Sequence, residues 1–126
     1  MKRLTVAAAI LLALLACSLF NAAYIQRTTD RMVIQLAQAA ACARENDWEQ
    51  ATQLTRQAYA VWQKHHFYLH ALMRHSDTDQ ILRGFRCVLQ YLDIQELDQY
   101  VSANADLSCQ IGLLAEMEQV SLANIL

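Results

Sequence analysis

Residues 4–20 read LTVAAAILLALLACSLF, a run of 17 residues without a charged side chain. Lys2 and Arg3 precede the run, and its apolar character continues to Ile25, which makes 22 residues in all. As a helix this stretch is about 33 Å long, enough to cross a hydrocarbon core of about 30 Å. We therefore expect residues 1–25 to be a membrane anchor or signal segment. Because positive charges favour the cytoplasmic side, Lys2 and Arg3 should keep the N-terminus in the cytoplasm. Residues 26–126 would then form an extracytoplasmic domain of a single-pass protein of the cell membrane.

Two kinds of processing compete with an uncleaved anchor. Residues 14–17 read LLAC, which resembles a bacterial lipobox, where Cys17 would be lipidated and the preceding residues removed. A signal peptidase that cuts after Ala23 would instead release the rest of the chain. All three alternatives place the remainder of the chain outside the cytoplasmic membrane.

From residue 28 onward the apolar residues recur with the 3.6-residue period of an α-helix. The pattern predicts four helices, the first of them continuous with the anchor to about Asn46. Short polar breaks favour antiparallel neighbours, so the expected fold is all-α, an N-terminal anchor helix followed by a small bundle of helical hairpins. Residues 120–126 are expected to pack as an apolar tail. The faces predicted to be buried are Met32, Leu36, Ala39, Ala40 and Ala43; Trp48, Ala51, Thr55, Ala58, Trp62 and then Leu69 and Leu72; Ile81, Phe85, Val88, Leu89 and Leu92; and Leu97, Tyr100, Val101, Leu107, Ile111 and Leu114.

The composition also favours helices. The 126 residues include no proline and two glycines, and 56% of them are hydrophobic while 17% are charged. This composition argues against a turn-rich β fold, a proline-rich linker and a disordered segment. Gly84 and Gly112 fall inside predicted helices, and we expect both to mark close contacts between helices. The formal net charge of −2 provides no basic surface for nucleic acid, so we expect no nucleic-acid partner.

Capping residues mark the predicted helix starts. Asp47 with Gln50 has the spacing of a capping box, and Asp93 repeats it with a glutamate three residues on. Between these two positions, Ser76 or Asp77 is the expected N-cap of the third helix.

Charge is unevenly divided along the chain. Residues 27–86 carry eight basic and six acidic side chains, whereas residues 87–126 carry six acidic and no basic ones. The simpler interpretation is that the acidic last helix lies beside the basic earlier ones. The functional interpretation is an acidic face that binds a partner.

Aromatic residues are the first candidates for binding. Trp48, Tyr59 and Trp62 recur along the second predicted helix, and residues 47–51 look like the start of a tetratricopeptide hairpin. A second copy at the 34-residue period is missing, so core packing is the preferred interpretation. We nevertheless select Trp48, Tyr59, Trp62, His66 and His70 as candidate binding residues on a surface or groove.

The two histidines suggest an alternative role. His66 and His70 are four residues apart and share a helix face, a spacing that can hold a transition metal or haem iron. The sequence between them lacks the glutamate of the helical metalloprotease motif, and a third ligand would come from elsewhere, such as Asp77 or Asp79. A solvated or half-buried histidine patch is the simpler interpretation. We therefore expect no metal and no other cofactor, and keep metal or haem binding as the alternative.

The remaining reactive residues form no known catalytic motif. The four cysteines, at positions 17, 42, 87 and 109, form no Cys-x-x-Cys pair, which argues against zinc-ribbon and thioredoxin-like sites. Two cysteine states are compatible with the sequence: one disulfide with a free thiol, or free half-buried cysteines. The sequence contains no glycine-rich phosphate loop and no nucleophile elbow, so we do not expect an enzyme.

Several short features occur together in one order. They are Asp47-Trp48 with Ala51, then Trp62, then His75 with Asp79, and the ending SLANIL at residues 121–126. Over nearly the whole chain this order resembles the bacterial domain-of-unknown-function family 4363. The resemblance implies a single-pass, mostly helical protein of Gram-positive-type bacteria, with no assigned activity and no catalytic residues. We expect a non-catalytic helical protein that acts as a protein-interaction module on the outer face of the cytoplasmic membrane.

Overall fold

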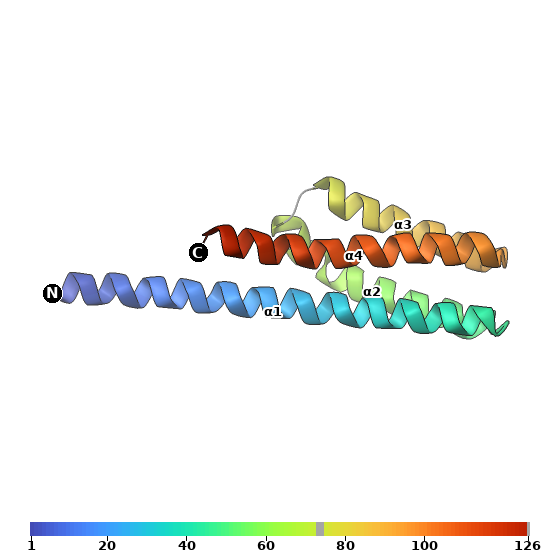
Figure 1. The fold of residues 1–126 in the computed structure, drawn as a ribbon, viewed down its shortest axis with the longest axis horizontal. Helices are drawn as coiled ribbons and strands as arrows, with labels where there is room; N and C mark the ends of the chain where they lie inside the picture. The colour runs from blue at the N-terminus through green and yellow to red at the C-terminus, as the bar shows by residue number, and fades with distance from the viewer. Residues whose placement is uncertain (73–74, 126) are drawn as a thin grey trace.

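The computed structural model describes the backbone of residues 1–72 and 75–125, and the side chains of residues 1–64 and 78–117. This part of the chain forms four α-helices: α1 (Lys2–Arg44), α2 (Trp48–Leu72), α3 (His75–Asp93) and α4 (Leu97–Ile125). Each helix packs against the next, and α4 packs back against α1 (Figure 1). The predicted all-α class, with an N-terminal apolar helix and an antiparallel bundle, is confirmed.

Helix α1 has two parts joined without a break. The N-terminus of α1 projects past the other three helices, while the C-terminal end of α4 reaches beyond α2 and α3 and runs beside part of the apolar segment (Figure 1). The second part of α1 is buried on one face from Ile25 onward. The prediction that the anchor helix continues into the bundle is therefore confirmed, although the helix ends at Arg44 rather than near Asn46.

The core combines small and large side chains. The first hairpin, α1 with α2, contributes mainly alanines to the buried faces near its turn, among them Ala43 and Ala51. The second hairpin contributes Phe85, Tyr100 and Leu107. Since protein interiors are close-packed, the small residues of one hairpin leave the volume that the large residues of the other fill. The residues predicted for the four buried faces are buried or half-buried wherever the structure describes their side chains.

The two hairpins turn in the same way. In the first turn the Asn46 N–H donates to Ala43 O and the Asp47 N–H donates to Cys42 O. These are the two hydrogen bonds of a Schellman motif, which needs a left-handed residue after the helix end. Asn46 is that residue, with a φ of 69°. In the second turn Gln95 takes the same place, with a φ of 56°, and the equivalent bonds run to Leu92 O and Tyr91 O.

Equivalent positions in the two hairpins lie 49 residues apart, as Asn46 and Gln95 do. The same shift relates the four buried polar residues of the described chain in two pairs, Thr29 with Thr78 and Thr55 with Asn104. The bundle is therefore two copies of one hairpin design, with α1 equivalent to α3 and α2 equivalent to α4.

One predicted cap is correct. The Gln50 N–H donates to Asp47 Oδ1 over 3.2 Å, as expected of an N-cap at the start of α2. The reciprocal half of the capping box does not form, because the Asp47 N–H already donates to Cys42 O.

Three other boundary predictions are wrong. Asp93 ends α3 instead of capping α4, whose first helical hydrogen bond runs from Tyr100 N–H to Glu96 O. Helix α3 already begins at His75, so Ser76 and Asp77 lie inside it and not before it. The backbone of residues 120–125 continues α4 and does not form a separate tail.

The two glycines differ in their surroundings. A Cβ atom on Gly84 would lie 2.8 Å from Leu107 Cδ1, which agrees with the expected close contact between α3 and α4. A Cβ atom on Gly112 would meet no atom within 4 Å. The expectation of close contact is therefore wrong for Gly112.

Candidate functional site

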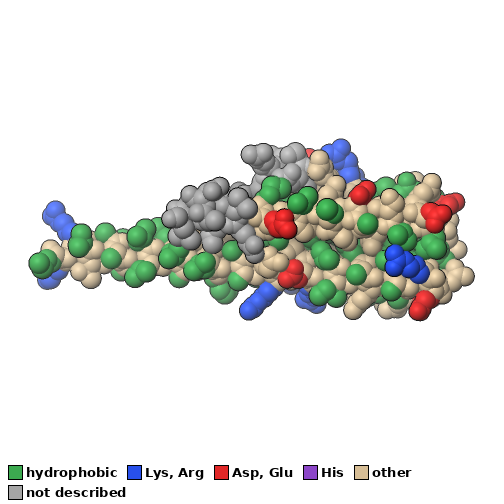
Figure 2. All heavy atoms as spheres, in the orientation of Figure 1, with side chains coloured by type: hydrophobic (Ala, Val, Ile, Leu, Met, Phe, Trp, Pro, Cys, Tyr) green, Lys and Arg blue, Asp and Glu red, His purple; other side chains and the backbone are tan. Residues whose placement is uncertain are grey.

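The first part of α1 exposes a continuous apolar surface. By length and composition, α1 is the one helix of the described chain that could cross a membrane, and its most apolar segment is not buried at all. Figure 2 shows this segment as a rod of apolar side chains projecting from the bundle. Isolated exposed apolar residues are normal, but a contiguous surface of this extent indicates a binding or membrane-facing role. Its large exposed side chains are Leu4, Val6, Ile10, Leu11, Leu12, Leu14, Leu19 and Phe20.

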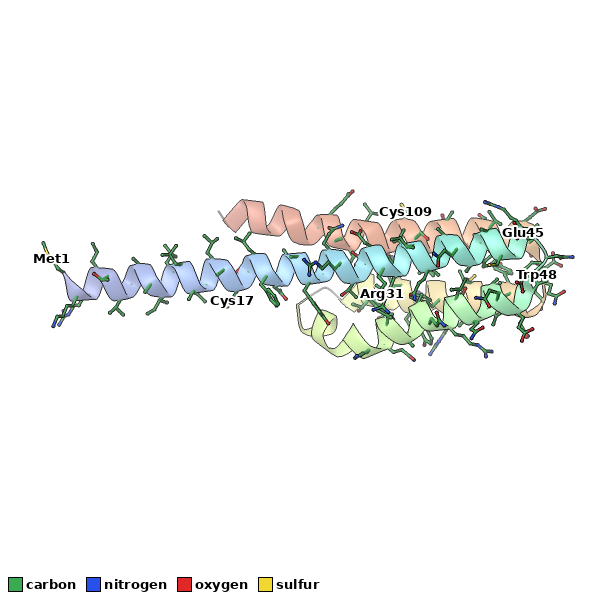
Figure 3. The ribbon with its side chains drawn as sticks, turned by 90° about the horizontal axis from the view of Figure 1, so that it is seen from below. Met1, Cys17, Arg31, Glu45, Trp48 and Cys109 are labelled. Atoms are coloured by element: carbon green, nitrogen blue, oxygen red, sulfur yellow. The ribbon has the colours of Figure 1, made fainter. Side chains whose placement is uncertain are left out.

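Polar groups bound this segment at both ends. Lys2 and Arg3 lie at its start, and Arg27 is the first charged residue after it. Tyr24, with 38% of its surface exposed, lies just before the buried face of α1 begins. Figure 3 shows Cys17 beyond the ends of α2 and α3, close to the level at which α4 ends, and Arg31 where α1 already runs beside α2.

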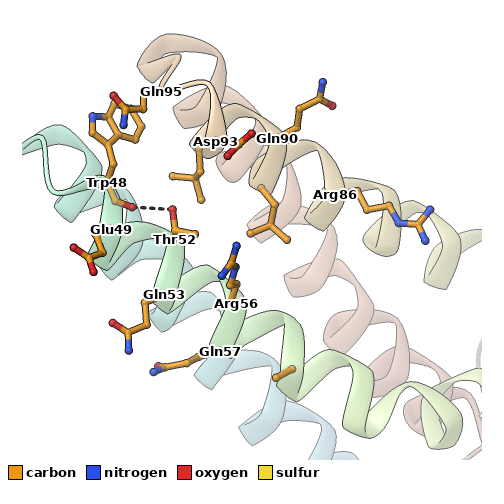
Figure 4. Close-up of a pocket in the computed structure, with 13 residues that line it drawn as sticks. Trp48, Glu49, Thr52, Gln53, Arg56, Gln57, Arg86, Gln90, Asp93 and Gln95 are labelled. Carbon is orange, nitrogen blue, oxygen red and sulfur yellow. Dashed lines mark hydrogen bonds between the residues drawn. The ribbon is translucent and has the colours of Figure 1, made fainter.

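A groove of about 1070 Å³ runs along the outside of α2 and α3. The contact between these two helices is the smallest of the four in the bundle, which leaves room between their outer faces. The groove begins at the turn end of the bundle, where Trp48 lies beside Gln95 (Figure 4). Polar and apolar groups contribute about equally to its walls, and Leu89 and Leu92 provide part of the apolar surface.

The charges in the groove are ordered along its length. Glu49 on α2 and Asp93 on α3 line the end near the turns. Arg56 and Arg86 line it seven residues further from the turns on the same two helices, about 10 Å away along the axis. All four side chains are exposed. The groove therefore has an acidic end and a basic end.

The three aromatic candidates on α2 have different surroundings. Trp48 is half-buried and lines the groove, its Nε1–H donates to Asn46 Oδ1 over 3.0 Å, and its ring meets Tyr100 edge-on with 6.3 Å between ring centroids. Tyr59 is half-buried and packs against Phe85 of α3 at 5.2 Å. Trp62 is 1% exposed, so its selection as a surface or groove residue is wrong. It is a core residue because its position, four residues after Ala58, lies on the buried face of α2.

The side chains of His66 and His70 lie outside the described residues, so the structure does not test the alternative metal or haem site. The same holds for Asp77. Among the side chains that are described, which include Asp79, no group of three or more His, Cys, Asp or Glu residues could hold a metal ion.

All four cysteines are free in this structure. Cys42 and Cys87 are half-buried, which agrees with the expectation of free, half-buried cysteines. Cys17 and Cys109 are exposed. The lipobox alternative requires an accessible Cys17, and its side chain is exposed.

One buried titratable group lies near the turn end. Burial raises the pKa of the Tyr100 phenol to about 12. The nearby Thr55 hydroxyl lowers this pKa in part. Thr55 Oγ1 donates its hydrogen to Ala51 O, and Tyr100 Oη has no well-formed hydrogen bond. Tyr100 faces the core and not the groove, so it is a packing residue.

Sequence reasoning missed most of the groove. Arg56, Arg86, Gln90 and Asp93 are solvent-exposed polar residues on two different helices. Their helical spacing predicts only a solvated face, and their proximity follows from the packing of α2 beside α3.

A family model described as Domain of unknown function (DUF4363) matches residues 19–125. The match covers the second part of α1 and the other three helices. No curated protein and no solved structure matches the chain.

Proposed function

The chain belongs to the DUF4363 family, and from this premise we propose that it is a non-catalytic, single-pass protein of the cell membrane that binds another protein through its helical bundle. The observation that carries the proposal is the continuity of α1, which leads from exposed apolar residues to the buried face that starts at Ile25. A continuous helix of this kind would fix the position of the bundle relative to the membrane.

The charges around the apolar segment favour an extracytoplasmic bundle. Lys2 and Arg3 precede the segment, and basic residues at that position favour a cytoplasmic N-terminus. Arg27 and Arg31 follow the segment and weaken this asymmetry.

The α2–α3 groove is the surface that we assign to the partner. Its acidic end at Glu49 and Asp93 favours a basic side chain of the partner, and its basic end at Arg56 and Arg86 favours an acidic one. We therefore propose a polar protein segment that carries opposite charges about 10 Å apart.

Anchoring and orientation are tested by labelling Cys109, whose side chain is exposed on α4. A membrane-impermeant maleimide added to whole cells that express the full chain should label it, and Cys109→Ser is the control. Labelling only after lysis would contradict the orientation, and recovery of the chain from the medium would contradict the anchor. The intact mass of the membrane-extracted chain separates the full-length form from forms lipidated at Cys17 or cut after Ala23.

The groove is tested by in-cell photocrosslinking. A benzoylphenylalanine at Gln53 or Gln90, which line the groove, should yield one adduct of defined mass, while the same residue at exposed Ser102 on α4 should not. Arg56→Glu with Arg86→Glu should abolish the adduct, whereas Arg83→Glu, an exposed arginine of α3 outside the groove, should leave it. Equal adducts from the groove and from Ser102 would reject this surface.

Metal or haem binding by His66 and His70 stays the alternative prediction. Equilibrium dialysis of the full chain with zinc, copper and haem tests it. Binding that His70→Ala leaves unchanged would reject a site at these two residues.

A further inference from the structure

Three cations lie at the end of the bundle next to the apolar segment. Arg27 and Arg31 are four residues apart and so project from neighbouring positions on one side of α1. Lys64 lies on the antiparallel helix α2, 18 residues after Asn46, while Arg27 and Arg31 lie 19 and 15 residues before it. Because helices rise equally per residue, the three side chains lie at similar distances from the turn.

These cations do not contribute ion pairs to the described part of the bundle. All three side chains are exposed, and within the described part of the chain none of them takes part in an ion pair. The acidic group closest in sequence, Asp30, accepts a hydrogen bond from Gln26 Nε2 over 2.9 Å. Among the described side chains, the other exposed acidic groups toward this end are Asp79 and Glu116, which belong to α3 and α4 and not to the helices that carry the cations.

Along α1, Arg27 lies at the height of the lipid headgroups and Arg31 lies just above them. The polar region on each side of a bilayer is about 5–7 Å thick, the difference between the full and hydrocarbon thicknesses shared by two faces. With the apolar segment ending at Ile25, Arg27 lies about 3 Å and Arg31 about 9 Å beyond the hydrocarbon edge. Long basic side chains reach from such positions to phosphate groups while their stems stay on apolar surface.

We propose that Arg27, Arg31 and Lys64 bind the phosphate groups of anionic phospholipids in the leaflet from which the bundle emerges. The proposal rests on the membrane anchor of the proposed function, but not on a protein partner in the groove. Each cation close to an anionic surface raises the affinity about fivefold. Helices α3 and α4, which carry Asp79 and Glu116 toward this end, gain nothing from such lipids, so α1 and α2 face the headgroups.

The test is a lipid titration of the full-length chain in detergent, followed by native mass spectrometry. The probes are dioleoyl phosphatidylglycerol and dioleoyl phosphatidylcholine, which share the same acyl chains. Phosphatidylglycerol should bind more tightly, and Arg27→Gln with Arg31→Gln should weaken it about 25-fold. Inorganic phosphate at the same concentration should not compete, which separates a lipid site from a site for free phosphate.

The matched control is Arg44→Gln with Arg56→Gln, two exposed arginines nearer the turn end. Arg44 is 17 residues beyond Arg27, about 25 Å along α1, which exceeds the Debye length of about 8–10 Å in physiological salt. The control should change the affinity less than twofold. Equal binding of the two lipids, or equal losses in the two double variants, would overturn the proposal. Because the purified chain is used, these outcomes are independent of the labelling of Cys109 and of photocrosslinking in cells.

Discussion

Asn104 on α4 donates a hydrogen bond from Nδ2 to the backbone carbonyl of Leu36 on α1, over 3.0 Å, and both residues are buried. The bond joins residues that are 68 positions apart in sequence and so fixes the relative positions of α1 and α4 along the bundle axis. Asn104→Ala should lower the free energy of unfolding by about 1–2 kcal/mol, from the lost hydrogen bond and the space left behind. Urea unfolding of the full chain in detergent, followed by circular dichroism, measures this change. Ser102→Ala, at an exposed position of the same helix, should stay within about 0.5 kcal/mol of the parent.

The two glycines should respond differently to alanine. Gly112→Ala should raise the free energy of unfolding by about 0.5–1 kcal/mol, because alanine favours a helix and the new Cβ meets no atom within 4 Å. Gly84→Ala should gain less or lose stability, since its Cβ would lie 2.8 Å from the buried Leu107 side chain. The same unfolding assay compares them, and a larger gain for Gly84→Ala would contradict the packing described for α3 and α4.

The second turn carries a residue that suits it poorly. Gln95 adopts a φ of 56°, a conformation that disfavours residues other than glycine and asparagine. Gln95→Gly should therefore stabilise the bundle by about 0.5–1 kcal/mol, and Gln95→Asn should act in the same direction without loosening the unfolded chain. Asn46→Gly should not stabilise, because Asn46 already tolerates its φ and accepts the Trp48 hydrogen bond. Destabilisation by both Gln95 variants in urea unfolding would contradict the turn geometry.

Burial of Tyr100 predicts a loss of stability at high pH. The pKa of its phenol is about 12 in the folded chain, against 10.0 for a tyrosine side chain in water. The folded state therefore holds the proton more tightly, its advantage is complete below pH 10, and it is lost as the pH rises from about 10 to 12. The loss amounts to at most about 2.7 kcal/mol.

Tyr100→Phe isolates this effect from the other tyrosines. The difference in unfolding free energy between the parent and Tyr100→Phe should be constant below pH 9 and should shift against the parent between pH 10 and pH 12. A constant difference over the whole range would show that Tyr100 ionises equally in the folded and unfolded chains.

The helices themselves follow from the sequence because their cores rest on a regular apolar period. Met32, Leu36 and Ala43 recur on one face of α1, and the residues predicted for the other three helices pack as expected. The helix boundaries are harder to predict than the helices, because a capping motif marks a helix start only where the preceding helix has already ended. Asp47 follows a left-handed asparagine, whereas Asp93 still belongs to α3 and the left-handed residue after it is a glutamine, which gives no turn signal.

The internal repeat could not be read from identities. At the shift of 49 residues, the described side chains from Thr29 to Lys64 match in only three places: Thr29 with Thr78, Asp30 with Asp79, and Gln50 with Gln99. What the hairpins share is the pattern of burial, and alanines in one correspond to larger residues in the other, as Ala51 does to Tyr100. The candidate site was equally hidden, because burial of Trp62 and the opening of the groove depend on how the hairpins pack together.

The unbroken course of α1 couples the direction of the bundle to the number of residues before it. One residue removed ahead of Ile25 would rotate everything beyond it by about 100° and move it by only about 1.5 Å. Removing seven residues would restore the direction to within about 20° while moving the bundle by about 10 Å. In the proposed anchored state, the azimuth of the α2–α3 groove and its distance from the bilayer are therefore two separately adjustable quantities, both encoded in the length of a single helix.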